Sequence, residues 1–167
     1  SRGRAGGYTL KLPSEEKHLR TREEFLAELA VFVAGYVAEK EFFNDISTGP
    51  SNDLKQATKL ARKLVTEYGM SDKLGPRTFG EHEELIFLGR EITEQRNYSE
   101  KVAQLIDQEV ERLMNNAMKT AKSLLARHRA KLELIVTALL EKETIEQDEF
   151  AALLGEKLKA VPVVPTM

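Results

Sequence analysis

The stretch TREEFLAELAVFVAGYVAEKE (Thr21–Glu41) carries both the start signal and the apolar spacing of a helix. Thr21, followed three residues later by Glu24, matches the capping box that begins many helices. Such a wide apolar face predicts a helix that is largely buried, so we expect a fold built around helices. The apolar residues recur at intervals of three and four and comprise Phe25, Leu26, Leu29, Phe32, Val33, Tyr36 and Val37.

Four further helices are expected on the C-terminal side. Gly69 is placed directly after the first of them, as the residue that commonly closes a helix in the left-handed conformation. Ser99 is expected to cap the longest helix, and Thr144 with Gln147 forms a second capping-box pattern. Residues 69–98 are rich in glycine and are expected to form a long loop with a short strand or turn. The expected helices cover residues 52–68, 99–127, 131–142 and 144–154.

The N-terminal part adds a possible strand. Tyr8–Leu12 alternates apolar and polar residues and stops at Pro13, which predicts a short strand or hairpin. The last residues, 156–167, contain two prolines and are expected to be a disordered tail. The predicted fold is therefore mainly α, a helical bundle-like domain over residues 1–155 with one short β element near the N-terminus.

Composition excludes several function classes. The 167 residues carry a net charge of −2 and no cysteine. The near balance of charge gives no electrostatic pull toward nucleic acid, and the absence of cysteine excludes disulfides and thiolate metal sites. The longest apolar run, Leu29–Ala38, is too short to span a bilayer, which needs about 20 residues. These properties predict a soluble domain without a nucleic-acid partner.

The three histidines do not form a metal motif by themselves. His18, His82 and His128 lie in different predicted elements, and none has a second histidine one helical turn away. His82 and Glu83 begin like an H-E-x-x-H zinc motif, but Ile86 occupies the position of the second histidine. A zinc site made from these histidines alone is not expected.

The segment STGPSNDL (Ser47–Leu54) is the most informative for function. Asp53 falls in the first turn of a predicted helix, where the helix dipole favours an ionised carboxylate. The local pattern alone indicates a capping residue. A metal ligand is the alternative, and it would require further ligands from elsewhere.

Several motifs in order resemble the C-terminal part of the peptidase domain of the FtsH family of ATP-dependent zinc metalloproteases. The resemblance extends over most of the chain, and its specificity comes from the combination of motifs rather than from any one of them. The motifs are GGYTLKLP (Gly6–Pro13), AGYVAE (Ala34–Glu39), STGPSNDLKQAT (Ser47–Thr58), LVTEYGMSDKLGP (Leu64–Pro76), FLGRE (Phe87–Glu91), YSEKVAQLIDQEV (Tyr98–Val110) and ETIEQDE (Glu143–Glu149).

The resemblance implies a zinc peptidase domain joined to an ATPase module of the AAA type. It implies that Asp53 is the third zinc ligand, beside two histidines of an H-E-x-x-H helix, and that Glu39 is either a support for the metal site or a surface residue. Tyr8, Thr9 and Leu10 correspond to an edge strand that pairs with extended protein substrates. ATP and Mg²⁺ would bind the ATPase module.

The sequence departs from the family in lacking the H-E-x-x-H motif. That motif and the ATPase module are expected upstream of Ser1, in a longer parent enzyme, so we expect the chain alone to be inactive. The resemblance implies that the parent is a homo-hexamer, anchored in an inner membrane by N-terminal segments, with its protease domain in the cytoplasm or an organelle. It would degrade membrane and misfolded proteins. A non-catalytic helical scaffold or oligomerisation module is the alternative.

Overall fold

The computed structural model describes residues 19–80 and 97–155, which contain five α-helices and no strand. The mainly helical fold class is therefore confirmed for these residues. The predicted strand at Tyr8–Leu12, the middle of the predicted loop and the predicted tail lie outside the described residues. His18 and His82 also lie outside them.

Helix α1 (Arg22–Phe43) begins as its sequence predicts. The backbone N–H of Thr21 donates a 2.8 Å hydrogen bond to the Glu24 carboxylate, and the Glu24 N–H donates to the Thr21 hydroxyl at 3.3 Å. This reciprocal pair satisfies two donors that a helix N-terminus otherwise leaves without partners. At the other end, Asn44 takes a left-handed conformation with φ 51° and stops the helix.

Helices α2 (Ser51–Thr66) and α3 (Glu100–Arg127) follow close to their expected positions. The hydroxyl of Ser99 accepts a hydrogen bond from the Val102 N–H, which confirms its role as the N-cap of α3. Gly69 does take a left-handed conformation, with φ 60°, but α2 ends at Thr66 with Glu67 as its C-cap. The prediction that Gly69 directly follows the helix cap is therefore wrong by one residue, because the helix stops earlier than its apolar pattern.

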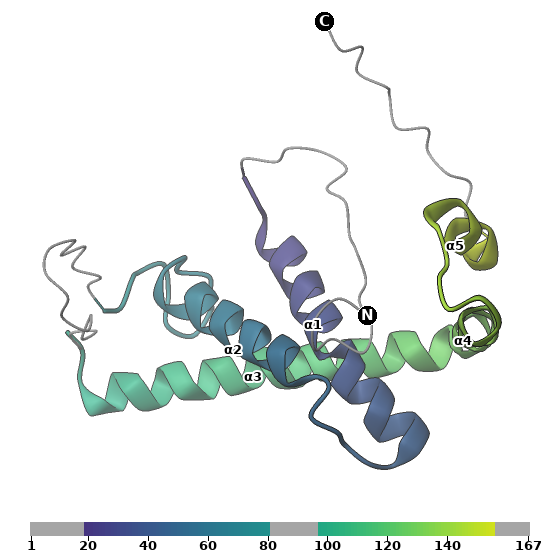
Figure 1. Ribbon diagram of the computed structural model, residues 1–167. Helices are drawn as coiled ribbons and strands as arrows, with labels where there is room; N and C mark the ends of the chain where they lie inside the picture. Colours follow the sequence, from purple (N-terminus) through teal and green to yellow (C-terminus); the bar gives the residue numbers. More distant parts are fainter. Residues whose placement is uncertain (1–18, 81–96, 156–167) are drawn as a thin grey trace, which may run out of the picture. The chain divides into compact units, whose positions relative to one another are not determined.

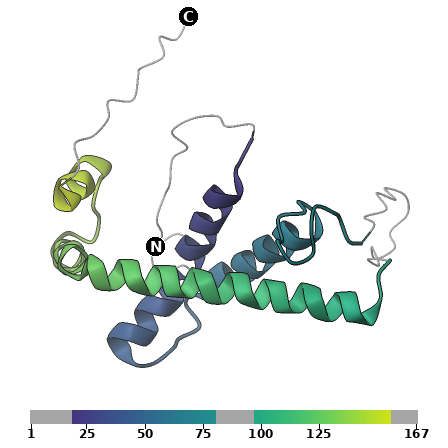
Figure 2. The same ribbon diagram turned by 180° about the vertical axis from the view of Figure 1, so that it is seen from behind.

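These three helices form the core of the described chain, and each contacts the other two. In Figure 1, α2 runs alongside α3 and α1 crosses α3; the reverse view in Figure 2 shows α3 in front of both. Most of the apolar stripe of α3 packs into this core, whereas Leu124 near its end is exposed. The core residues include Leu29, Val33, Ala57, Ala61, Leu64, Val65, Ile106, Leu113, Ala117 and Ala121.

Helices α4 (Arg129–Lys142) and α5 (Gln147–Leu154) contain no buried residue. The capping box expected from Thr144 and Gln147 is wrong, because the N-cap of α5 is Glu146 and it makes no side-chain capping bond. Thr144 lies in the connection that follows α4. Gly155 closes α5 in the left-handed conformation with φ 70°, and the helix ends at Leu154, the predicted last residue. None of the described helices is long and apolar enough to cross a membrane.

Candidate functional site

The connection between α1 and α2 lies between the two site residues predicted in the described part of the chain, Glu39 in α1 and Asp53 in α2. Asn44 turns the backbone out of α1, and buried Pro50 stands at the N-cap of α2 with φ −75°. The Ser51 N–H donates to the Thr48 carbonyl at 3.2 Å, which tightens the turn that leads into α2. The end of α1 and the first turn of α2 are thus joined by a short loop, residues 44–50.

Glu39 holds this loop through both of its carboxylate oxygens. Its Oε2 accepts a 2.7 Å hydrogen bond from the backbone N–H of Ser47, and its Oε1 accepts one of 2.8 Å from the Ser47 hydroxyl. Hydrogen bonds to an ionised carboxylate are among the stronger ones in proteins. Glu39 therefore lies at the loop, half-buried and engaged, rather than free at the helix surface.

The Ser47 hydroxyl continues the hydrogen-bonded chain toward α2. It accepts a 3.0 Å hydrogen bond from the Gly49 N–H. A Cβ atom at position 49 would lie 3.1 Å from the Ser47 Oγ and 3.3 Å from the Glu39 Oε1. Glycine thus lets the loop backbone approach this pair of side chains closely.

Beside these contacts lies a small surface hollow of about 270 Å³. Glu39 and Ser47 form one part of its wall. Phe43 and Ile46 also line it, with 77% and 47% of their surface exposed. The Asp45 carboxylate also lines the hollow and accepts a 2.7 Å hydrogen bond from the Ile46 N–H. The loop thus combines apolar surface with carboxylate oxygens next to the start of α2.

Asp53 lies in the first turn of α2 and is exposed. The N-cap position is taken by Pro50, and no side chain makes a capping hydrogen bond there. Within the described residues, the structure gives the Asp53 carboxylate no hydrogen bond and no ion pair. Its oxygens are therefore open to a ligand, while the interpretation of Asp53 as a hydrogen-bonding cap gains no contact in support.

One carboxylate is not a complete metal site. Among residues 19–80 and 97–155, no three His, Cys, Asp or Glu side chains come close enough together to hold a metal ion. His128 lies at the C-cap of α3 and belongs to a different part of the chain from Asp53. A catalytic zinc site uses three protein ligands and a water, so Asp53 fits zinc only as one member of a larger set.

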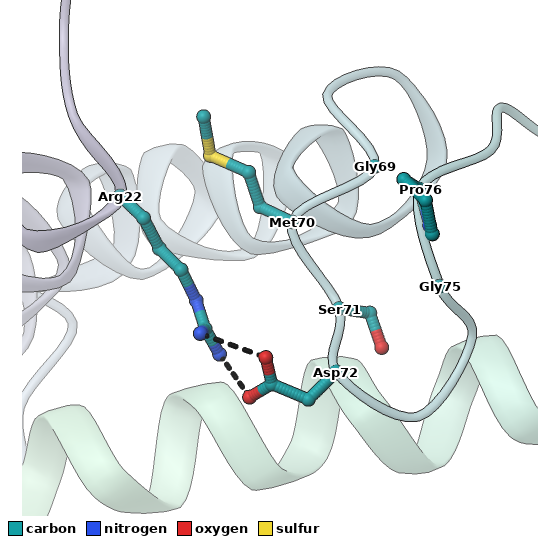
Figure 3. Close-up of a pocket in the computed structure, with 7 residues that line it drawn as sticks. All are labelled: Arg22, Gly69, Met70, Ser71, Asp72, Gly75 and Pro76. Atoms are coloured by element: carbon teal, nitrogen blue, oxygen red, sulfur yellow. Dashed lines mark hydrogen bonds and ion pairs between the residues drawn. The ribbon is translucent and has the colours of Figure 1, made fainter.

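A second hollow of about 360 Å³ lies next to the turn that follows α2 (Figure 3). The guanidinium of Arg22 donates two hydrogen bonds to the Asp72 carboxylate, at 2.9 and 2.6 Å. These hydrogen bonds and the positive charge of Arg22 lower the pKa of Asp72. Because the two charges neutralise each other, this hollow offers no free acid or base and is a weaker candidate than the α1–α2 loop.

The sequence pattern did not identify Ser47 as a functional contact. Glu39 and Ser47 are eight residues apart and lie in different structural contexts, so no helical or strand spacing pairs them. The serine in the STG segment was the available signal, but a serine before a glycine and a proline is equally typical of an ordinary turn. The pairing depends on how Asn44 redirects the chain after α1.

Comparison with known proteins defines the class to which this fold and loop belong. The profile of Peptidase family M41 matches residues 1–153. The match covers most of the chain, and the chain therefore belongs to that peptidase family.

The relatives are ATP-dependent zinc metalloproteases named FtsH. The chain is 56% identical over 156 residues to FtsH 1 of Thermomicrobium roseum, covering 93% of this chain and 24% of that protein. It is 46% identical over 158 residues to FtsH of Thermotoga maritima, covering 95% of this chain and 26% of that protein. The chain thus spans about a quarter of the length of these curated relatives. It is a part of the peptidase region of this metalloprotease family.

Proposed function

We propose that this chain forms the C-terminal part of the proteolytic domain of an ATP-dependent zinc metalloprotease. Asp53 supplies one zinc ligand, and an H-E-x-x-H helix from preceding polypeptide supplies the two histidines and the catalytic glutamate. The observation that carries the proposal is the exposed Asp53 carboxylate, free of hydrogen bonds to the described residues, in the first turn of α2. The first turn of a helix is a favourable place for a negatively charged side chain, and carboxylate oxygens are among the ligands that zinc takes.

In this proposal, the residues of this chain supply Asp53 as a zinc ligand and hold its carboxylate in position. Zinc bound at such a site polarises the scissile carbonyl and lowers the pKa of its bound water. Glu39 supports the site from α1, because its two hydrogen bonds to Ser47 fix the loop that leads to α2. Support of this kind around a metal ligand commonly changes metal affinity or activity by about 10–100-fold.

Protein substrates would bind by their main chain. Tyr8, Thr9 and Leu10 form the proposed edge strand, where an extended polypeptide adds by backbone hydrogen bonds. Such binding accepts many different side chains, which suits the degradation of membrane and misfolded proteins. We further propose that the parent protein is a homo-hexamer with ATP and Mg²⁺ in an ATPase module, and that segments outside this chain anchor it to an inner membrane, with the protease domain in the cytoplasm or an organelle.

The first test is the coding sequence upstream of Ser1 and the enzyme it encodes. We expect an H-E-x-x-H motif there, and we expect Asp53→Asn in the longer protein to remove zinc and proteolysis while ATP hydrolysis and ring assembly persist. The exchange keeps the size of the side chain and removes its charge. Zinc content by mass spectrometry and casein degradation measure the two losses.

Asp148→Asn is the matched control, because Asp148 is also an exposed aspartate in the first turn of a helix. Any loss due only to the helix dipole would appear in both variants. Retention of zinc by Asp53→Asn would contradict the metal role. The 167-residue chain alone is expected to hold no stoichiometric zinc and to cleave no peptide, because one carboxylate cannot replace three ligands.

A scaffold function receives less support from the structure. Its basis in the sequence was the long apolar stripe of the helix that is now α3, together with the two helices that follow it, α4 and α5. Buried residues of that stripe, among them Ile106, Leu113 and Ala117, pack into the core with α1 and α2. They are therefore not a free surface for a partner, whereas α4 leaves apolar side chains exposed, among them Leu134 and Leu140.

A further inference from the structure

We propose that the Ser47 hydroxyl is a positioning group for Asp53. Its hydrogen bonds link Glu39, near the end of α1, to the turn that begins α2. This link fixes the position of the Asp53 carboxylate. The inference rests on the proposed role of Asp53 as a zinc ligand, but it assigns a separate duty to a residue that does not touch the metal.

Hydrogen bonds and the covalent backbone together form a continuous relay from Glu39 to the first turn of α2. The Ser47 hydroxyl donates to Glu39 Oε1 at 2.8 Å and accepts from the Gly49 N–H at 3.0 Å. Gly49 precedes Pro50, whose carbonyl accepts the first hydrogen bond of α2, from the Leu54 N–H at 2.9 Å. Asp53 lies within the turn that this bond closes. A displacement of Gly49 is therefore passed directly to the backbone that carries Asp53.

Core packing reaches the first turn of α2 only at its two ends, through buried Pro50 at the N-cap and through Leu54, which packs partly buried against the core. The first fully buried residue of the helix is Ala57, one turn after Asp53. Ser51, Asn52 and Asp53 are all exposed and make no contribution to the core. The loop contacts therefore add to the order that Pro50 and Leu54 give this turn, at three residues that face solvent.

Serine suits this duty because its hydroxyl both donates and accepts. In Ser47→Ala, the Gly49 N–H and one Glu39 oxygen would turn to water, which is available at this exposed loop. The fold would survive, since no buried group loses its partner, but the first turn of α2 would be held less firmly. Gly49→Ala perturbs the same relay sterically, because its Cβ would lie 3.1 Å from the Ser47 Oγ.

The relay is tested first in this chain, without metal, by amide hydrogen exchange. We expect Ser47→Ala to speed exchange at Gly49 and through the first turn of α2 by about fivefold, the effect of one ordinary hydrogen bond. Ser47→Thr keeps a hydroxyl and should restore protection. Thr48→Ala is the control, because it removes the neighbouring exposed hydroxyl, for which the described residues provide no hydrogen-bond partner. Unchanged exchange in Ser47→Ala would overturn the proposal.

The effect on the metal is tested in the longer protein by zinc titration against a competing chelator. We expect Ser47→Ala and Gly49→Ala to weaken zinc by about tenfold, with Ser47→Thr close to wild type and the unfolding midpoint unchanged. If Asp53→Asn loses zinc but Ser47→Ala binds it normally, the positioning role is wrong and the ligand role stands. If Asp53→Asn also keeps zinc, the proposed function itself fails.

Discussion

The Ser71 hydroxyl donates a 2.7 Å hydrogen bond to the Glu109 carboxylate, joining the turn after α2 to the middle of α3. Both residues are buried, each with 3% of its surface exposed. Arg112 donates two further hydrogen bonds to the same carboxylate, at 3.0 and 2.9 Å. The charged carboxylate is tolerated in a helical core because both of its oxygens accept hydrogen bonds.

This network makes the stability of the chain sensitive to acid. The hydrogen bonds from Arg112 lower the pKa of Glu109, and Ser71 adds to the effect, against the opposing influence of burial. A lowered pKa in the folded state means that the ionised carboxylate stabilises the fold above its unfolded pKa. That contribution is lost as the pH falls through the folded pKa.

We therefore expect Glu109→Gln to lower the free energy of unfolding at pH 7 by about 1–3 kcal/mol. The difference from wild type should shrink at an acid pH below the lowered pKa of Glu109, where the wild-type carboxylate is protonated as well. Urea unfolding followed by circular dichroism at both pH values measures it. Glu111→Gln, an exposed neighbour on α3, is the control and should have little effect at either pH. An equal loss at both pH values would show that the charge is not involved.

Substituting alanine for each of two glycines in the turn after α2 distinguishes the energetic cost of backbone strain from the cost of steric crowding. Gly69 and Gly75 both have positive φ, 60° and 77°. A Cβ at Gly69 would lie 3.1 Å from the Arg77 backbone nitrogen, whereas nothing lies within 4 Å of a Cβ at Gly75. Gly75→Ala should cost about 1–2 kcal/mol from the left-handed conformation alone. Gly69→Ala should cost clearly more, because backbone must also move, and thermal unfolding of the two variants compares them.

The packing of α1 predicts a sharp contrast between two of its apolar residues. Leu29 is completely buried between the helices, while Val31 is 65% exposed. Leu29→Ala should reduce the free energy of unfolding by about 3–5 kcal/mol through lost burial and a residual cavity. Val31→Ala should change it by less than about 0.5 kcal/mol. Equal losses in urea titrations would mean that Val31 is covered in solution.

Local signals predicted the helices well where the governing interaction lies within one turn. Thr21 with Glu24 and Ser99 with Val102 are contacts over three residues, and both form as expected. The same reasoning failed at Thr144, because the chain uses that residue in the connection after α4. Sequence pattern shows that a cap is possible, but tertiary geometry decides which residue is the cap.

The candidate site was predictable only in part. The resemblance singled out Asp53 and Glu39, and the structure places one at the start of α2 and the other near the end of α1. The contact that orders the loop, between Glu39 and Ser47, depends on the reversal at Asn44 and has no sequence period of its own. The buried Glu109 was also missed, since a glutamate in a charged helix is normally exposed. The strand at Tyr8–Leu12 and the loop expected over the residues between 80 and 97 stay predictions.

The hold of one side chain on the loop also constrains how the protein can vary among lineages. The Glu39 carboxylate accepts a hydrogen bond from the Ser47 hydroxyl, so a mutation at either position removes the hydrogen bond between the two side chains. Tolerated changes should therefore arrive together, with the loss of the carboxylate at position 39 accompanied by the loss of the hydroxyl at position 47. Homologues in which positions 39 and 47 drift independently would signal a loop held by some other means.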